Sequence, residues 1–184
     1  MKQYTNTILM IEPVDFRFNE QTAVNNYFQN ETDESAETIQ QKALNEFQNM
    51  VSKLREHGVN VIVLKDTLKP HTPDSIFPNN WISFHENKMI ALYPMFAENR
   101  RDERREDDVL ELLGEKGFDT EEVMDYTSAE EDEIYLEGTG SIILDRENRI
   151  AYAAVSPRTD EELFLEFCED FEYTPVIFEA NQTV

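Results

Sequence analysis

One order of elements recurs along this sequence: strand, strand, helix, strand. Two pairs of β-rich runs flank turn-forming residues at 85–88 and 145–149 and predict two β-hairpins. Both turns share a Glu-Asn-(Lys/Arg) triplet. Each hairpin is followed by a helix and then a strand, so the unit recurs about every 60 residues. A period of this length indicates blades or an array of units, and not one open sheet.

Apolar residues at three- and four-residue spacing predict three helices: residues 36–56, residues 102–116 and a segment that begins after Thr159. Gly58 and Gly117 follow the first two as the expected helix stops. Thr159 and Glu162 form a capping-box pattern at the start of the third helix. A strand is predicted after each helix, at residues 59–64, 118–126 and 174–179.

The first unit is incomplete, because residues 7–12 are its one clear strand before the helix. The last predicted strand, residues 174–179, lies close to the C-terminal residue, which leaves an open edge. We therefore expect a single partial α/β domain over residues 1–184 and a functional unit larger than this chain. The missing C-terminal part, or self-association at the open edge, is the expected partner.

The charge of the chain excludes some functions. There are 39 acidic and 16 basic residues, a net charge of −23, and 40% of the residues are hydrophobic. So negative a chain is repelled by nucleic acid, whereas its apolar content predicts a packed core. No apolar run is long enough to span a membrane, and the single cysteine fits a reducing compartment. We expect a cytoplasmic protein that binds neither nucleic acid nor membrane and needs no cofactor.

Two loops join the third strand of one unit to the next hairpin, and both carry polar residues. Asp74 and Asn80 lie in the first loop and Glu137 in the second. Equivalent placement would bring these side chains near a common axis, where carboxylates suit a planar guanidinium. The alternative is that Pro-Asp and Asn-Asn form turns and that Glu-Gly ends a strand.

Arginines follow both hairpins. Arg100 and Arg101 follow the first, and Arg158 follows the second. This placement suggests a paired site for a substrate carboxylate, which arginine binds with fork geometry. The alternative is a solvated helix start, favoured at Arg100 and Arg101 because further arginines crowd that segment.

The histidines and the cysteine do not predict a reactive cluster. His57, His71 and His85 have no zinc-site spacing. Cys168 lies on the apolar stripe of the third helix, as expected of a buried structural thiol. The acidic run 129–133 is typical of a solvated loop.

In three of its segments, residues 73–85, 136–141 and 155–159, the sequence resembles the guanidino-group-modifying superfamily, and residues 25–29 also fit. The closest resemblance is to amidinotransferase-like proteins known as citrulline-utilisation hydrolases; arginine deiminase and dimethylarginine dimethylaminohydrolase are other members. The resemblance implies a five-bladed α/β-propeller of ββαβ units, the pentein fold, with about three of five blades present. It implies no cofactor.

The resemblance also implies residue roles. Glu137 matches the catalytic-site glutamate that binds the guanidinium, and Asp74 an acid near the substrate's amino-acid end. Asn80 stands where many relatives have an aspartate. Arg101, or its neighbour Arg100, and Arg158 match arginines that hold the substrate carboxylate.

The family reaction uses a cysteine nucleophile and a histidine, and none of the histidines here, nor Cys168, lies in a matching motif. We therefore expect the N-terminal, substrate-binding portion of a hydrolase or amidinotransferase that acts on an arginine- or citrulline-like compound, inactive alone. A truncated chain, a disrupted gene and half of a split enzyme all stay open. The alternatives are a non-catalytic binding module and an acidic interaction protein that retain the fold.

Overall fold

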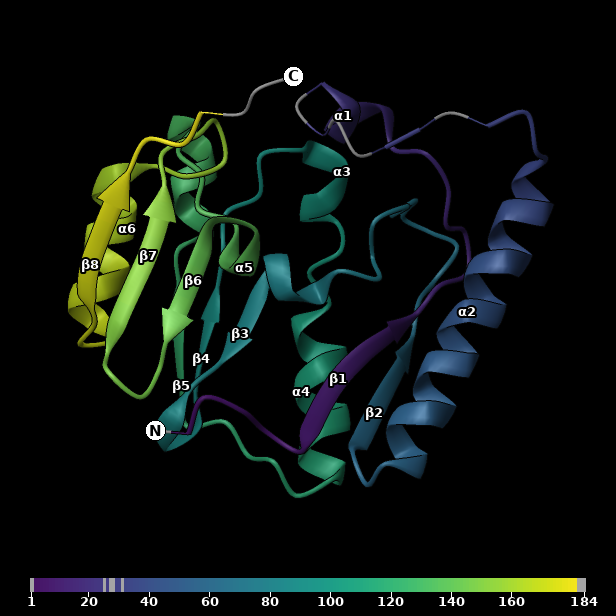
Figure 1. Cartoon of the computed structure of the whole chain (residues 1–184), viewed down its shortest axis with the longest axis horizontal. Helices are drawn as coiled ribbons and strands as arrows, with labels where there is room; N and C mark the ends of the chain where they lie inside the picture. Colours follow the sequence, from purple (N-terminus) through teal and green to yellow (C-terminus); the bar gives the residue numbers. More distant parts are fainter. Residues whose placement is uncertain (1, 25, 27–28, 31, 182–184) are drawn as a thin grey trace. The chain divides into compact units, whose positions relative to one another are not determined.

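The computed structural model describes residues 2–24, 26, 29–30 and 32–181. They form a mixed α/β fold (Figure 1), which confirms the predicted class. The chain divides into two compact units. Unit 1 comprises Met1–Tyr4, Asn79–Phe96 and Asp119–Val184; unit 2 comprises Thr5–Pro78 and Ala97–Phe118.

Unit 2 is built on two parallel strands, β1 (Thr7–Glu12) and β2 (Asn60–Lys65). Helices α2 (Ala36–Glu56) and α4 (Glu106–Glu115) both contact β2. Val61 and Ile62 are consecutive and point to opposite faces of the sheet, yet both are buried. Both faces of β2 are therefore covered, as is typical of parallel strands that alternate with helices.

Two short helices complete unit 2: α1 (Glu20–Ala23) and α3 (Glu98–Arg101). The prediction of one helix from residue 102 is wrong at its start. Arg105 has non-helical backbone angles, φ −102° and ψ 58°, so α4 begins only at Glu106. Helix α2 has the predicted bounds, and Ser35 caps it by accepting a hydrogen bond from the N–H of Thr38.

Both glycines predicted as helix stops have left-handed backbones, with φ +82° at Gly58 and +83° at Gly117. After α2, the N–H of Val59 donates to the carbonyl of Leu54 and that of Gly58 to Arg55. The same pair of bonds follows α4 at Gly117. These are Schellman motifs, in which glycine avoids the steric cost of positive φ.

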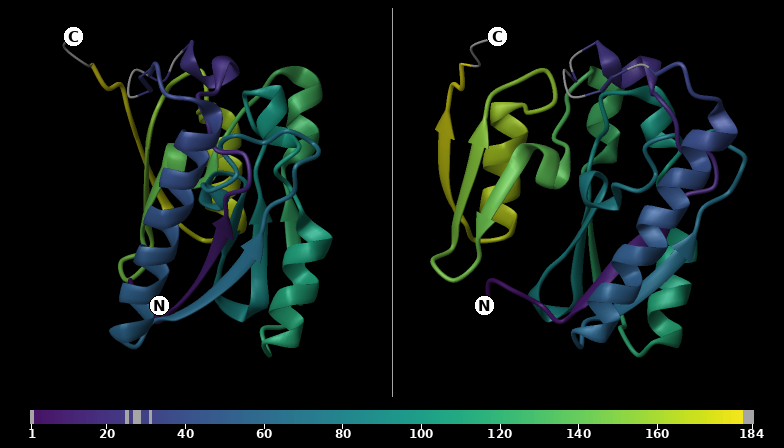
Figure 2. Two further views of the ribbon diagram at one scale, coloured as in Figure 1. Left: turned by 90° about the vertical axis from the view of Figure 1, so that its right-hand side faces the viewer. Right: turned by 45° about the vertical axis from the view of Figure 1, so that its right-hand side comes forward.

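Unit 1 contains two three-stranded sheets of the same topology (Figure 2). In one, β3 (Ile82–Phe84) is antiparallel to β4 (Met89–Leu92), and β4 is parallel to β5 (Glu122–Asp125). In the other, β6 (Ile142–Asp145), β7 (Ile150–Ala154) and β8 (Thr174–Phe178) repeat this arrangement. Both predicted hairpins are therefore confirmed.

Helix α6 (Glu161–Asp170) contacts β8 and buries Leu163, Phe164, Phe167 and Cys168 in the core of unit 1. The predicted capping box at Thr159 is wrong by one residue. Asp160 is the N-cap, and its Oδ1 accepts the N–H of Leu163 at 2.9 Å. The hydroxyl of Thr159 instead donates a hydrogen bond to the hydroxyl of Ser141 at 2.8 Å.

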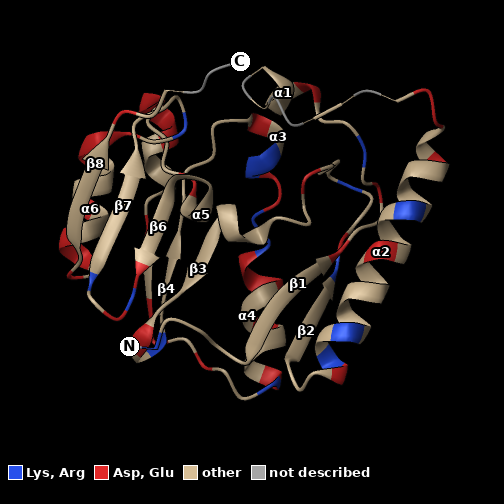
Figure 3. Cartoon of the chain, in the orientation of Figure 1, with Lys and Arg blue, Asp and Glu red and all other residues tan. Residues whose placement is uncertain are grey.

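Acidic residues lie on the helices and in the loops (Figure 3). They occupy the first turns of α4 and α6, where they face the positive end of the helix dipole. Among the described residues, no helix combines the length and the apolar character that a bilayer crossing requires.

Candidate functional site

Glu137 lies in unit 1 between a buried residue, Leu136, and a single helical turn, α5 (Gly138–Ser141). Its backbone is fixed at both ends. The N–H of Glu137 donates to the carbonyl of Arg158 at 3.2 Å, and its carbonyl accepts the N–H of Ser141 at 2.7 Å. The Ser141 hydroxyl donates to the same Arg158 carbonyl at 2.6 Å. The predicted site segments 136–141 and 155–159 are therefore tied together.

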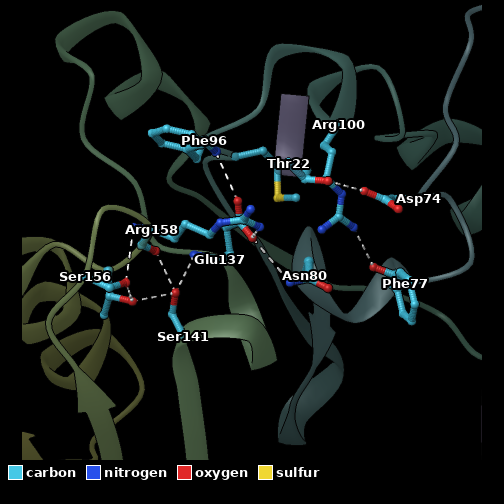
Figure 4. A network of polar contacts seen from close by, with 12 residues as sticks. Thr22, Asp74, Phe77, Asn80, Phe96, Arg100, Glu137, Ser141, Ser156 and Arg158 are labelled. Atoms are coloured by element: carbon cyan, nitrogen blue, oxygen red, sulfur yellow. Dashed lines mark hydrogen bonds and ion pairs between the residues drawn. The ribbon is translucent and has the colours of Figure 1, made fainter. Parts of the chain in front are cut away.

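The carboxylate of Glu137 is 1% exposed and accepts hydrogen bonds from Phe96, Asn80 and Arg158 (Figure 4). The N–H of Phe96 donates to Oε1 at 3.2 Å. The Asn80 amide donates to Oε2 at 3.4 Å, and Arg158 Nη1 donates to the same atom at 3.2 Å. A buried carboxylate needs such partners, because an unpaired charge away from water is costly.

Asn80 is held by the close approach of two glycines. A Cβ added at Gly138 would lie 2.3 Å from the carbonyl oxygen of Asn79, and one at Gly140 would lie 2.3 Å from Asn80 Nδ2. At Gly138 the obstacle is backbone, which cannot move aside, whereas at Gly140 it is the end of the Asn80 side chain. The absence of a Cβ at these two positions therefore leaves room for the Asn79 carbonyl and for the Asn80 amide that donates to Glu137.

Arg158 projects from the turn that closes residues 156–159, in which the N–H of Ser156 donates to the carbonyl of Thr159. Its guanidinium is paired with Glu137 and lies over the ring of Phe96, 5.9 Å from the centroid. The side chain is 20% exposed. The structure thus brings together three of the predicted site residues: Asn80, Glu137 and Arg158.

Asp74 lies in unit 2, where it is buried in a polar network. Its Oδ2 accepts the Asn19 amide at 2.7 Å and the Thr22 hydroxyl at 3.1 Å. Gln29 in turn donates to Thr22 at 2.7 Å and accepts the N–H of Asn19. The Asp74 carboxylate is therefore fixed by the chain around α1, and the turn-former alternative does not account for its burial.

The two arginines after the first hairpin differ. Arg100 is 4% exposed, and its Nε and Nη2 donate to the two carboxylate oxygens of Glu103 at 3.0 and 2.9 Å. The alternative of a solvated helix start is therefore wrong for Arg100, because its guanidinium is buried and paired with Glu103 within unit 2. Arg101 is half-buried at the end of α3. The pairing of Arg101 with Arg158 around a carboxylate stays a prediction.

Several residues that hold Glu137 and Asp74 in place were not predicted from the sequence. Phe96 and Ser141 contact Glu137 or its neighbours, and Asn19 and Thr22 hold Asp74. Ser141 could have been found, because it ends the conspicuous 136–141 segment. Of the segment 25–29, Asn25, Tyr27 and Phe28 lie outside the described residues.

The remaining reactive groups lie in other surroundings. Burial, with the positive charges of Arg146 and Arg149, lowers the pKa of His85 to about 3. Burial raises the pKa of the Cys168 thiol to about 11, as predicted for a structural cysteine. In the part of the chain that the structure describes, no His, Cys, Asp and Glu cluster suits a metal ion.

Three solved structures illustrate the similarity of this fold to proteins that act on or bind arginine-related compounds. The N-terminal domain of ArgZ, an arginine dihydrolase of cyanobacteria, superposes with a TM-score of 0.65 at 18% identity, over 96% of this chain and 58% of that one. Dimethylarginine dimethylaminohydrolase from Pseudomonas aeruginosa, with bound citrulline, gives a TM-score of 0.64 at 14% identity, over 97% and 62%. AgrE, with ornithine and NAD+, gives 0.65 at 18% identity, over 97% and 24%. The chain thus spans less than two thirds of the length of these proteins.

The fold is that of the pentein enzymes that modify guanidino groups. The family described as "N,N dimethylarginine dimethylhydrolase, eukaryotic" matches residues 12–184, and this chain belongs to it. A search of curated proteins found no match.

Proposed function

We propose that this chain is the substrate-binding portion of a hydrolase or amidinotransferase that acts on the guanidino or ureido group of an arginine- or citrulline-like compound. Membership of the family and the likeness to arginine- and citrulline-binding structures support the substrate class. Glu137 would bind the guanidinium, and Arg158 and Arg101 the substrate carboxylate.

The observation that carries this proposal is the state of Glu137. Its carboxylate is buried at 1% exposure and is already in contact with a guanidinium, that of Arg158. A carboxylate that pairs with a planar, multiply donating cation in a water-poor setting is the group that recognition of free arginine needs. Asp74, buried and fixed by two donors, would serve the amino-acid end in the complete enzyme.

The rest of the fold would supply the chemistry. The two sheets of unit 1 share one topology, and we propose that they are blades of a five-bladed α/β-propeller of which this chain holds about three. The nucleophilic cysteine and the histidine of the reaction would come from the part of the fold that this chain lacks. That part, or a second copy at the open edge, is the proposed partner.

Asn80 refines the substrate class. A carboxylate can only accept hydrogen bonds, whereas the Asn80 amide donates to Glu137 and also has an oxygen acceptor. An amide therefore tolerates a ureido oxygen better than an aspartate would. We expect Asn80→Asp to shift ligand preference from citrulline-like towards arginine-like compounds, and an unchanged preference would contradict this assignment.

Calorimetry on the full chain tests the proposal, with arginine, citrulline and dimethylarginine as ligands. Glu137→Gln should weaken binding by at least ~30-fold, because a charge-assisted pair is replaced by a neutral contact, a loss of about 2 kcal/mol. The matched control is Glu147→Gln, the same change at an exposed position in the β6–β7 turn. Equal effects of the two variants, or no binding by the parent chain, would refute the proposal.

A non-catalytic binding module is the second candidate. The observation that favours it is that His85, which packs against the ring of Phe171, and Cys168, which is buried in the core of unit 1, make none of the contacts described for Glu137. Turnover would separate the candidates. The chain combined with the C-terminal remainder of a family member should release ammonia, an amine or urea from one of the three ligands; ligand binding without turnover would favour the binding module.

A further inference from the structure

The guanidinium of Arg158 occupies the carboxylate that the proposed function assigns to the substrate guanidinium. Arg158 Nη1 is 3.2 Å from Glu137 Oε2, and the other oxygen of Glu137 accepts the N–H of Phe96. The guanidinium is also the group that lies over the Phe96 ring. Figure 4 shows the Arg158 side chain reaching across to Glu137 from the 156–159 turn.

The turn and the side chain are held differently. The Arg158 backbone is fixed, because its carbonyl accepts from Glu137 and from Ser141 and its N–H donates to Ser156 Oγ at 3.2 Å. The side chain is 20% exposed and has several rotatable bonds. The guanidinium can therefore leave Glu137 by a change of rotamer while the turn keeps its place.

We infer that, without ligand, the Arg158 guanidinium occupies the position of the ligand guanidinium on Glu137, and that binding exchanges the Arg158–Glu137 ion pair for two ion pairs with the ligand. The ligand guanidinium takes the place of the Arg158 guanidinium on Glu137. The displaced Arg158 then takes the ligand carboxylate. The inference rests on the proposed function, and it turns two separate binding roles into one coupled step.

The exchange determines specificity. An arginine-like ligand has a carboxylate as well as a guanidinium, so both ions of the broken pair are paired again. A guanidine without a carboxylate leaves Arg158 displaced with no ligand group to pair with, and that loss opposes binding. The site therefore selects amino-acid guanidines over simple guanidines, although Glu137 contacts the guanidinium alike in both.

The experiment compares arginine with agmatine, which is arginine without its carboxylate, by calorimetry on the full chain. The parent chain should bind arginine about tenfold more tightly than agmatine. In Arg158→Gln, agmatine should bind about tenfold more tightly than it does to the parent, because no guanidinium has to be displaced. Arginine should lose most of its advantage over agmatine and keep only the part that Arg101 contributes through the ligand carboxylate.

A plain carboxylate-binding role for Arg158 predicts a different result: Arg158→Gln would weaken arginine and leave agmatine unchanged, and that outcome overturns the exchange. Arg158→Lys is the substitute if the glutamine variant does not fold. It keeps a cation beside Glu137 but loses the forked guanidinium, so its gain in agmatine affinity should be smaller. Arg149→Gln, at a half-exposed arginine paired with Glu86, is the control and should leave both affinities unchanged.

Glu137→Gln separates the two proposals. If this change abolishes arginine binding but agmatine gains nothing in Arg158→Gln, the proposed function stands and the exchange is wrong. If arginine binding survives Glu137→Gln, or if no ligand binds the parent chain, the proposed function fails and the exchange fails with it.

Discussion

The stability of unit 1 should depend on pH through His85. The imidazole lies 4.1 Å from the Phe171 ring centroid, and its Nε2 is 2.6 Å from the Ser83 hydroxyl, which is in turn 2.6 Å from Tyr93 Oη. Its Nδ1 is buried, and no group of the described residues forms a hydrogen bond with it. Burial first, and then the charges of Arg146 and Arg149, lower the pKa from 6.5 to about 3.

The folded state therefore holds His85 neutral, and between pH 6.5 and pH 3 the unfolded chain binds one more proton than the folded chain. Stability from this group is complete above pH 6.5 and is lost as the pH falls through that window. Between pH 7 and pH 5 the loss is about 2 kcal/mol, because the proton uptake covers roughly 1.5 pKa units at ~1.4 kcal/mol each.

Urea unfolding followed by circular dichroism at pH 7, 6 and 5 measures this loss. The variant His85→Phe keeps a ring against Phe171 and cannot titrate, so between pH 7 and pH 5 the parent should lose about 2 kcal/mol more than the variant. His57→Gln, at an exposed position after α2, is the control and should follow the parent. Parallel stability curves for the parent and His85→Phe would refute the reasoning.

Three further predictions follow from local geometry. Gly138→Ala should lower the free energy of unfolding by ~2–3 kcal/mol, because the added Cβ would meet the Asn79 carbonyl oxygen. Gly114→Ala should raise it by ~1 kcal/mol, because Gly114 lies inside α4 with open space around it. Urea titration measures both changes. Glu172→Gly should raise the melting temperature, since Glu172 has φ 57° at the end of α6, a position that costs a side chain ~1 kcal/mol. Cys168, 2% exposed with its thiol pKa raised to about 11, should react with a disulfide reagent only after denaturant is added; reaction in buffer would contradict its burial.

The local features of the fold could be predicted because neighbouring residues determine them. Gly58 and Gly117 end their helices through backbone bonds within five residues, and both hairpins follow from turn residues between apolar strands. The cap of α6 was misplaced because Thr159 and Asp160 are both good N-caps, and the choice depends on the bond between Thr159 and Ser141, which lie 18 residues apart in sequence.

The site was only partly predictable for the same reason. The repeat placed Asn80 and Glu137 in equivalent loops, and these side chains are in contact. The network around Asp74 joins residues more than fifty positions apart, and no local pattern signals it. Nor could sequence show that Arg158 turns inward to Glu137, because that choice of rotamer depends on the ring of Phe96 and on the burial of the carboxylate.

The contact between α5 and the Asn79–Asn80 backbone has a consequence for how this site can diverge. A side chain at residue 138 would meet the carbonyl oxygens of Asn79 and Asn80, which belong to the backbone. Residue 138 can therefore vary only if the 79–80 backbone shifts. A side chain at residue 140 would meet only the Asn80 amide, so residues 80 and 140 can change together while both loops keep their backbone positions.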